Sequence, residues 1–192
     1  MSSVGMRVDV EGVHGCNEVF LGVLKAIIGK YASSRSMIDL CCNLAPLTRE
    51  LGFGKRVYVD ILERDLGEEN PHFVRADVLG DHEVFQQQYD VSLCLDGIEH
   101  LHKDQGVQLL ERMKTISDKR IIFTPLDPWM MEPHNPHPET HKSVWTPEDL
   151  PGWASIVYPV YHPTLNIGAW FGWHCGNIES DFRRVCRELN FV

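Results

Sequence analysis

A chain of 192 residues is most simply a single domain, because that length can bury most of its surface around one core. Apolar residues make up 43% and charged residues 23%, which is ordinary for a soluble globular protein. The net charge of −9 argues against a broad basic surface for bare nucleic acid. No apolar run approaches the roughly 18 residues of a membrane helix, and residues 1–15 show no signal peptide, so we expect a cytoplasmic protein without membrane contact.

The six cysteines stand at positions 16, 41, 42, 94, 175 and 186. They form no Cys-x-x-Cys pair and no zinc-ribbon spacing. Two of them fall in expected core strands, so we expect reduced, buried thiols.

Apolar periodicity predicts an alternation of helices and strands along the chain. Strands are expected at 37–40, 56–61, 72–78, 89–95 and 119–124, followed by an antiparallel hairpin at 154–161 and 167–174. Helices are expected from 17 to about 31, near 46–51, at 81–88, from Asp104 onward and at 179–189. The helix after Asp104 should bury a face made of Val107, Leu110, Met113 and Ile116. Strands that alternate with helices imply a parallel, doubly wound sheet in an α/β domain.

We interpret the stretch from Ser36 to Thr48 as the segment around which the rest of the domain is arranged. It contains a short apolar strand, a tight turn of small residues and Pro46, which suits the first turn of a helix. Such a strand, turn and helix start place backbone amides beneath a nucleotide-like ligand. Asp39 lies inside the apolar strand and needs a partner, which a turn amide or a ligand cation would supply. The next two strands also end in acids, at Asp60 and Asp77.

The segment from Pro125 to Trp145 is rich in proline and carries His134, His137 and His141. Its length and composition are typical of a functional loop rather than a plain connector. We therefore expect one domain over 1–192, with an N-terminal arm at 1–16 and a lid loop at 125–145. The three histidines invite a zinc site, but no helix aligns their rings. A metal-binding protein that uses the 134–141 histidines is therefore an alternative.

The order of these elements resembles the class I S-adenosylmethionine-dependent methyltransferases over roughly residues 17–175. Ser36 to Thr48 is similar to their first motif, a strand carrying Asp-Leu followed by a glycine-rich turn. Asp96-Gly-Ile-Glu-His-Leu101 resembles the end of their fourth strand, and His141 to Leu150 is similar to a segment after their fifth strand. The resemblance implies a Rossmann-like, doubly wound seven-stranded sheet, mostly parallel with a C-terminal antiparallel hairpin.

The resemblance also implies S-adenosylmethionine as the cofactor and indicates where it binds. Asp60 stands where the family places an acid on the ribose hydroxyls, and Asp77 where it places one near the adenine amino group. The cofactor-binding residues implied in this way are Asp39, Cys41, Asn43, Ala45, Asp60, Ile61, Asp77, Val78 and Asp96. Cys41, Asn43 and Ala45 replace glycines of the family's turn. Asn43 tolerates a left-handed backbone best after glycine, whereas Cys41 fits only with a negative φ.

The sequence therefore predicts an S-adenosylmethionine-dependent methyltransferase that acts on a small molecule or a peptide side chain. The methyl carbon of a sulfonium is already electrophilic, so we expect transfer without a metal and with His100 or His141 as the catalytic base. No Gly-x-Gly-x-x-Gly follows the first strand, which argues against a nicotinamide-dependent oxidoreductase. A non-catalytic S-adenosylmethionine-binding protein is the remaining alternative.

Overall fold

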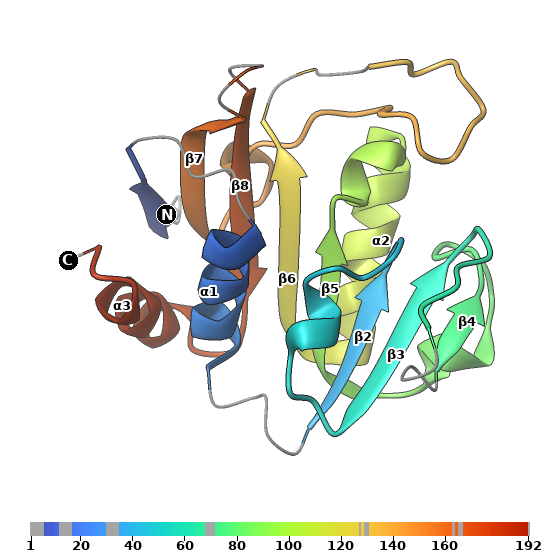
Figure 1. Cartoon of the computed structure of the whole chain (residues 1–192), viewed down its shortest axis with the longest axis horizontal. Coiled ribbons are helices and arrows are strands. Elements are labelled where there is room, and N and C mark those ends of the chain that lie inside the picture. The colour runs from blue at the N-terminus through green and yellow to red at the C-terminus, as the bar shows by residue number, and fades with distance from the viewer. Residues whose placement is uncertain are drawn as a thin grey trace.

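An eight-stranded mixed sheet forms the centre of the molecule (Figure 1). The computed structural model describes residues 6–11, 17–29, 35–67, 72–126, 128, 131–162, 164 and 167–191. The strands are β1 (Met6–Asp9), β2 (Ser36–Leu40), β3 (Lys55–Asp60), β4 (Phe73–Arg75), β5 (Tyr89–Leu95), β6 (Ser117–Pro125), β7 (Ala154–His162) and β8 (Ile167–His174). The helices are α1 (Asn17–Ile28), α2 (Lys103–Ile116) and α3 (Ile178–Glu188).

The sheet order is β1-β7-β8-β6-β5-β2-β3-β4, and β8 is antiparallel to both of its neighbours. All other neighbouring strands run parallel. The predicted mostly parallel sheet with a terminal antiparallel hairpin is therefore confirmed. The strand count is eight rather than seven, because β1 pairs with β7 and places Met6 opposite Ala154. The expected N-terminal arm thus supplies an edge strand, whose four residues were too short an alternation to read as one.

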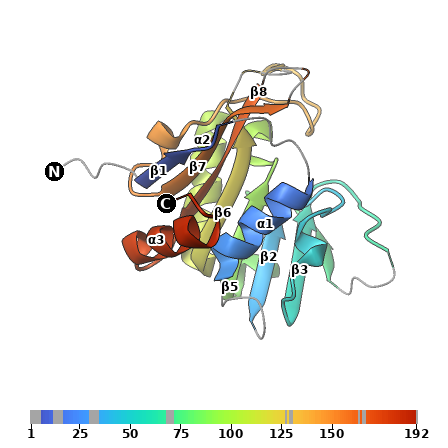
Figure 2. The ribbon, with the colours of Figure 1, turned by 60° about the vertical axis from the view of Figure 1, so that its left-hand side comes forward.

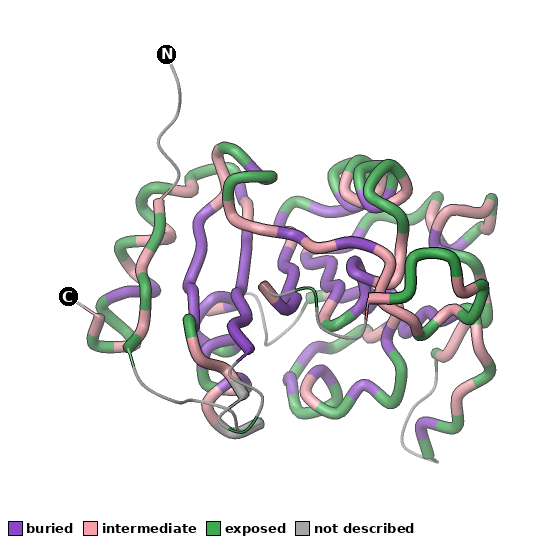
Figure 3. Tube along the Cα trace, turned by 90° about the horizontal axis from the view of Figure 1, so that it is seen from above, coloured by how far each residue is buried: buried purple, intermediate pink, exposed green. Residues whose placement is uncertain are grey.

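Two apolar layers cover the two faces of the sheet. On one face, Phe20 of α1 packs against Phe123 and Phe171, with ring centroids 5.0 Å and 5.5 Å away, and α3 contributes Val185 to the same layer. On the other face, α2 buries Leu109 against the sheet (Figure 2). Buried residues accordingly follow the strands, and exposed residues lie on the outer turns of the helices and loops (Figure 3). Within the described ranges, no helix has the length and apolar character needed to cross a bilayer.

Two of the expected helices are only single 3₁₀ turns. Thr48–Glu50 forms one after β2, and Glu83–Gln86 forms the other before β5. The turn after Pro46 ends at Leu51, where the backbone becomes extended before β3, and one turn is too short to sustain an α-helix. Helix α1 ends at Ile28 instead of near Tyr31, and residues 30–34 lie outside the described part of the chain.

The buried face of α2 differs from the predicted one. Val107 is 51% exposed, so its assignment to that face is wrong. Gly106 faces the core instead, because the ring of Trp145 from the lid loop fills the space beside it. A Cβ at residue 106 would lie 2.3 Å from Cζ2 of Trp145. This contact holds the far end of the lid loop against the body of the protein.

The described cysteines are all free. Cys42, Cys94, Cys175 and Cys186 are buried, as expected for reduced thiols, whereas Cys41 is half-buried. Cys16 lies outside the described residues.

Candidate functional site

A cavity of about 310 Å³ opens at the carboxyl ends of β2, β3 and β5. Its lining includes four predicted cofactor residues at the ends of β2 and β3: Cys41, Asn43, Asp60 and Ile61. It also includes Asp77, Val78, Asp96 and His100. Asp39 and Ala45 line an adjacent cavity of about 100 Å³, which shares Asn43 and Asp96 with the first. The predicted residues therefore gather at one edge of the sheet, as ligand sites of open α/β sheets do.

The turn after β2 is built from three left-handed residues. Cys41, Asn43 and Ala45 have φ values of 58°, 45° and 49°. Asn43 adopts the left-handed backbone that it tolerates well, whereas Cys41 does not meet the condition of a negative φ under which it was expected to fit this turn. A left-handed backbone costs a residue with a side chain about 1–2 kcal/mol, so surrounding bonds must hold this turn. The amide of Cys42 donates to the carbonyl of Val59 at 3.0 Å. The amide of Ala45 donates to the carbonyl of Cys42 at 2.7 Å.

Close packing behind this turn explains Gly97. A Cβ at residue 97 would lie 2.7 Å from the Cys41 Cβ and 2.8 Å from the Cys94 sulfur. Only glycine therefore lets the chain after β5 pass beneath the turn after β2.

Asp39 is buried, with 2% of its surface exposed. Its Oδ2 accepts a hydrogen bond from the hydroxyl of Thr48 at 2.5 Å, whereas its Oδ1 is buried and has no hydrogen-bond partner. Burial raises the pKa of this carboxyl to about 7, and the charge of Asp60 adds to the rise. The sequence predicted a turn amide or a ligand cation as the partner of Asp39, whereas the structure supplies the Thr48 hydroxyl and leaves one acceptor oxygen beside the smaller cavity unsatisfied.

Asp60 holds two loops together at the end of β3. Its two oxygens accept the amide hydrogens of Asn43 and Leu62, each at 2.9 Å. Each oxygen has a second lone pair and can accept a further hydrogen bond from a ligand. Asp77 is exposed, and its Oδ1 accepts the Leu79 amide at 2.9 Å.

Sequence reasoning missed Arg64, a cation in the wall of the larger cavity. Its Nε lies 3.6 Å from Oδ1 of Asp60, and its Nη2 donates to Oε1 of Glu139 at 2.7 Å. The hydrogen bond from Arg64 lowers the pKa of Glu139. The signal that could have found it is the four-residue spacing from Asp60, which places a cation next to a strand-end acid.

A second pair of acids lies where β5 ends. Burial raises the pKa of Glu99 to about 8, and the charge of Asp96 contributes to that rise. Desolvation raises the pKa of Asp96 to about 7; this residue is also exposed toward the cavity, where water offsets part of the rise. Oε2 of Glu99 accepts the hydroxyl of Thr124 at 3.0 Å. Sequence reasoning had given Glu99 no role of its own.

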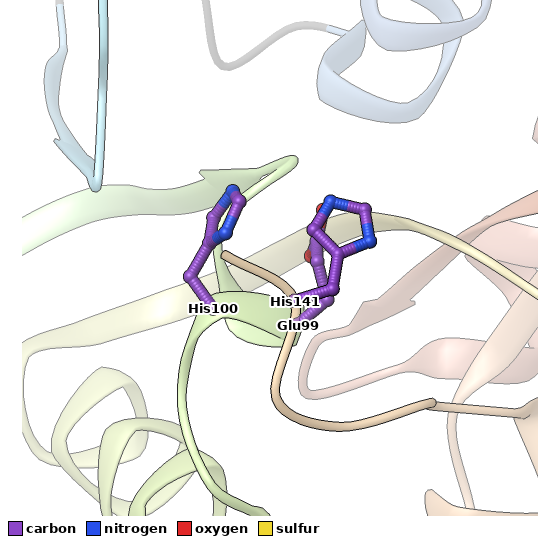
Figure 4. A group of neighbouring side chains, drawn as sticks. All are labelled: Glu99, His100 and His141. Atoms are coloured by element: carbon purple, nitrogen blue, oxygen red, sulfur yellow. The ribbon is translucent and has the colours of Figure 1, made fainter. Parts of the chain in front are cut away.

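The two predicted catalytic histidines meet beside Glu99 (Figure 4). The ring centroids of His100 and His141 lie 5.0 Å apart. His100 lines the larger cavity, whereas His141 is absent from the lining of either cavity. Burial lowers the pKa of His100, so its imidazole is neutral near pH 7. The sequence alone could not show that the lid loop folds back and brings His141 next to His100.

Two neighbouring amides of the lid loop fix this meeting point. The amides of Lys142 and Ser143 donate to the carbonyl of Glu99 at 2.7 Å and 3.1 Å. The Nζ of Lys142 donates to the carbonyl of His100 at 3.0 Å. The loop runs above the carboxyl ends of the parallel strands (Figure 1), and these bonds tie it to the turn that follows β5.

The chain matches no protein-family profile and no curated protein sequence. It does match solved structures of methyltransferases. A SAM-dependent methyltransferase from Archaeoglobus fulgidus superposes with a TM-score of 0.55 at 16% identity, over 83% of this chain and 95% of that one. The 1,6-didemethyltoxoflavin-N1-methyltransferase of Burkholderia thailandensis, with 1,6-didemethyltoxoflavin and S-adenosylhomocysteine bound, gives a TM-score of 0.56 at 15% identity, over 85% and 92%.

A third similar structure is the small RNA methyltransferase HEN1, with a TM-score of 0.53 at 15% identity. The match covers 85% of this chain but only 26% of that longer one. The three proteins share their fold with this chain, and the substrates named for the second and the third differ. The predicted fold is therefore confirmed: this chain has the fold of the class I S-adenosylmethionine-dependent methyltransferases.

Proposed function

We propose that this protein is an S-adenosylmethionine-dependent methyltransferase. The observation that carries the proposal is the cavity at the carboxyl ends of β2, β3 and β5, into which Asp60, Asp77 and Asp96 all open. Acids that end or follow β3, β4 and β5 suit a ligand that offers hydroxyl groups, an amino group and a positive charge. The fold adds support by analogy, because a methyltransferase with this fold has been solved with S-adenosylhomocysteine bound.

The residues present fit that cofactor. The unpartnered Oδ1 of Asp39 beside the smaller cavity can accept a hydrogen bond from a ligand or contact a cationic group of it. The larger cavity, about 310 Å³, lies at the lower end of the range of small-molecule sites, about 300–1,000 Å³, and the smaller cavity adjoins it. Asp60 keeps lone pairs free for two further hydrogen bonds.

Each predicted residue then has a physical task. Asp60 would accept the ribose hydroxyls, and Asp77 would accept the adenine amino group between the apolar Ile61 and Val78. Asp39 and Asp96 would face the cationic methionine end, next to the turn of Cys41, Asn43 and Ala45. When bound, the cofactor supplies an electrophilic methyl group on a sulfonium. The chain itself must orient the acceptor, exclude water with the lid loop and manage the acceptor's proton near His100.

The acceptor that we propose is a small molecule or a peptide side chain. The protein has a net charge of −9. The cations in the cavity wall are engaged within the protein: Arg64 with Glu139, and Lys142 with the carbonyls of His100 and His137. A strongly acidic protein without a basic tract holds a polyanion poorly.

Calorimetric titration of the full chain with S-adenosylhomocysteine and with NAD tests the cofactor assignment. We expect one S-adenosylhomocysteine per chain and no heat with NAD. Binding of NAD alone, or of neither compound, would overturn the proposal. The protein is then incubated with S-adenosylmethionine that carries a labelled methyl group and with a panel of small molecules and peptides. Transfer of the label to one of them distinguishes an enzyme from a non-catalytic binding protein.

A further inference from the structure

We infer that Glu99, His100 and His141 form a binding site for one first-row divalent metal ion of the Zn²⁺ class (Figure 4). One ligand atom from each side chain lies within 4.8 Å of those of the other two. This inference is an alternative to the metal-free transfer expected from the sequence, which stays a prediction. It concerns a cation and does not depend on the methyl donor.

The spacing needs little adjustment to hold an ion. Imidazole nitrogens and carboxylate oxygens lie about 2.0–2.2 Å from zinc, so two ligands of one tetrahedral ion are about 3.4 Å apart. Closing from at most 4.8 Å to that separation requires each ligand atom to move by at most about 0.7 Å, which side-chain rotation supplies. No backbone rearrangement is needed.

The backbone already brings the ligands together from two distant segments. Glu99 and His100 lie in the 3₁₀ turn after β5, and the carbonyl of Glu99 accepts two amide hydrogens from the lid loop, as described above. The amide of Glu132 donates to the carbonyl of His141 at 2.9 Å and closes the base of that loop. The Thr124 hydroxyl orients the carboxylate of Glu99 from behind. These contacts organise the ligands before any ion arrives.

The local charge favours a cation. Glu99 is 2% exposed, and a carboxylate that deep needs a counter-charge to ionise. The negative charges of Asp96 and Glu139 act on this cluster, and they oppose the positive charge of Lys142. Nδ1 of His100 is buried without a hydrogen-bond partner, so one imidazole nitrogen there is unsatisfied.

The ligand set selects the class of ion. Two imidazoles and one carboxylate suit Zn²⁺ and its first-row neighbours, whereas Mg²⁺ and Ca²⁺ prefer oxygen ligands throughout. Three protein ligands leave at least one coordination position open. Because His100 lines the larger cavity, an ion held here lies at the cavity wall. It would favour acceptors that carry an oxygen or nitrogen ligand.

The alternative site in the lid loop is not formed. His134 and His137 are exposed, and within the described residues His141 groups with Glu99 and His100 instead. His134 therefore offers a matched control, because it is an exposed histidine of the same loop that lies outside the cluster.

Calorimetry of the full chain, first treated with a chelator, tests the site with Zn²⁺, Co²⁺ and Mg²⁺ and without any methyl donor. We expect one Zn²⁺ per chain and at least 100-fold weaker binding of Mg²⁺. His141→Ala and Glu99→Gln should each weaken Zn²⁺ binding at least tenfold, and His134→Ala should leave it unchanged. Glu99→Gln keeps an oxygen for the Thr124 hydroxyl, and thermal unfolding without metal identifies any variant that fails to fold.

Unchanged Zn²⁺ affinity in His100→Ala and His141→Ala would overturn the assignment, as would loss of binding in His134→Ala. The absorption spectrum of the Co²⁺ form adds an independent check. A thiolate-to-cobalt band would place the ion on cysteines and refute the site. The S-adenosylhomocysteine titration is performed separately, so failure of the metal site and failure of the proposed function are distinguishable.

Discussion

Replacement of Asp60 by alanine should weaken both the protein and its ligand site. The side chain is buried, with 6% of the residue exposed, and accepts two amide hydrogens at 2.9 Å. Leaving both amides without an acceptor should cost about 2–4 kcal/mol of unfolding free energy. For a domain of this size, that loss corresponds to a fall in Tm of about 5–15 °C.

The same substitution removes the proposed acceptor of the ribose hydroxyls. Charge-assisted hydrogen bonds contribute about 1.5–3 kcal/mol each, so the affinity for S-adenosylhomocysteine should fall at least about tenfold. Differential scanning calorimetry measures the first effect, and isothermal titration below the lowered Tm measures the second. Asp65→Asn is the matched control, because Asp65 also accepts one amide hydrogen but is exposed and outside the cavity lining.

The result that would refute this reasoning is an Asp60→Ala protein with the Tm and affinity of the original chain. A lowered Tm with unchanged affinity would leave Asp60 as a clamp between two loops and remove it from the cofactor site. Asp60→Asn refines the outcome, because it preserves the shape of the side chain but only one of the two acceptors.

The lid loop should be cut more slowly by a protease when S-adenosylhomocysteine is present; equal cleavage with and without ligand, together with protection elsewhere, contradicts a lid role. Asp39→Asn should match the original stability near pH 4 and exceed it at pH 8 by up to about 4 kcal/mol, measured by denaturant unfolding across that range. The sign follows because burial raises the pKa of Asp39 from 3.8 to about 7, so the folded state loses stability as rising pH ionises this carboxyl. Gly106→Ala should lower Tm and change tryptophan fluorescence by displacing Trp145. Gly22→Ala is the control and should raise Tm slightly, because the space around its Cβ position is open. Equal effects of the two changes would show that Trp145 is not packed tightly against Gly106.

Much of the fold was readable because each element carried its own pattern. The run at 89–95 and the hairpin strand at 167–174 match β5 and β8 to the residue, since their apolar stretches are bounded by polar turns. The acids at Asp60 and Asp77 could be placed at one sheet edge because parallel strands all end there. Strand β1 could not be found in this way, because its stability comes from β7, which lies far along the chain.

The site was less predictable, since its details depend on tertiary contacts. The left-handed backbone of Cys41 is imposed by bonds from the neighbouring strand and not by its own preference. The position of Arg64 at the cavity wall depends in part on Glu139, which the lid loop brings within 2.7 Å of its guanidinium. The exposed position of Val107 follows from the ring of Trp145 on the adjacent face of α2, which helical periodicity does not encode.

The single 3₁₀ turn after β2 affects which ligand charge the crevice favours. A long α-helix at this position would direct about half a positive charge from its first amides toward the ligand. Here three residues form the turn, and carboxyl groups of Asp39 and Asp96 dominate the same corner. Such a corner favours a positively charged sulfonium over the uncharged thioether that remains after methyl loss. We therefore expect S-adenosylhomocysteine to bind less tightly than S-adenosylmethionine, and turnover to be less limited by slow release of the spent donor.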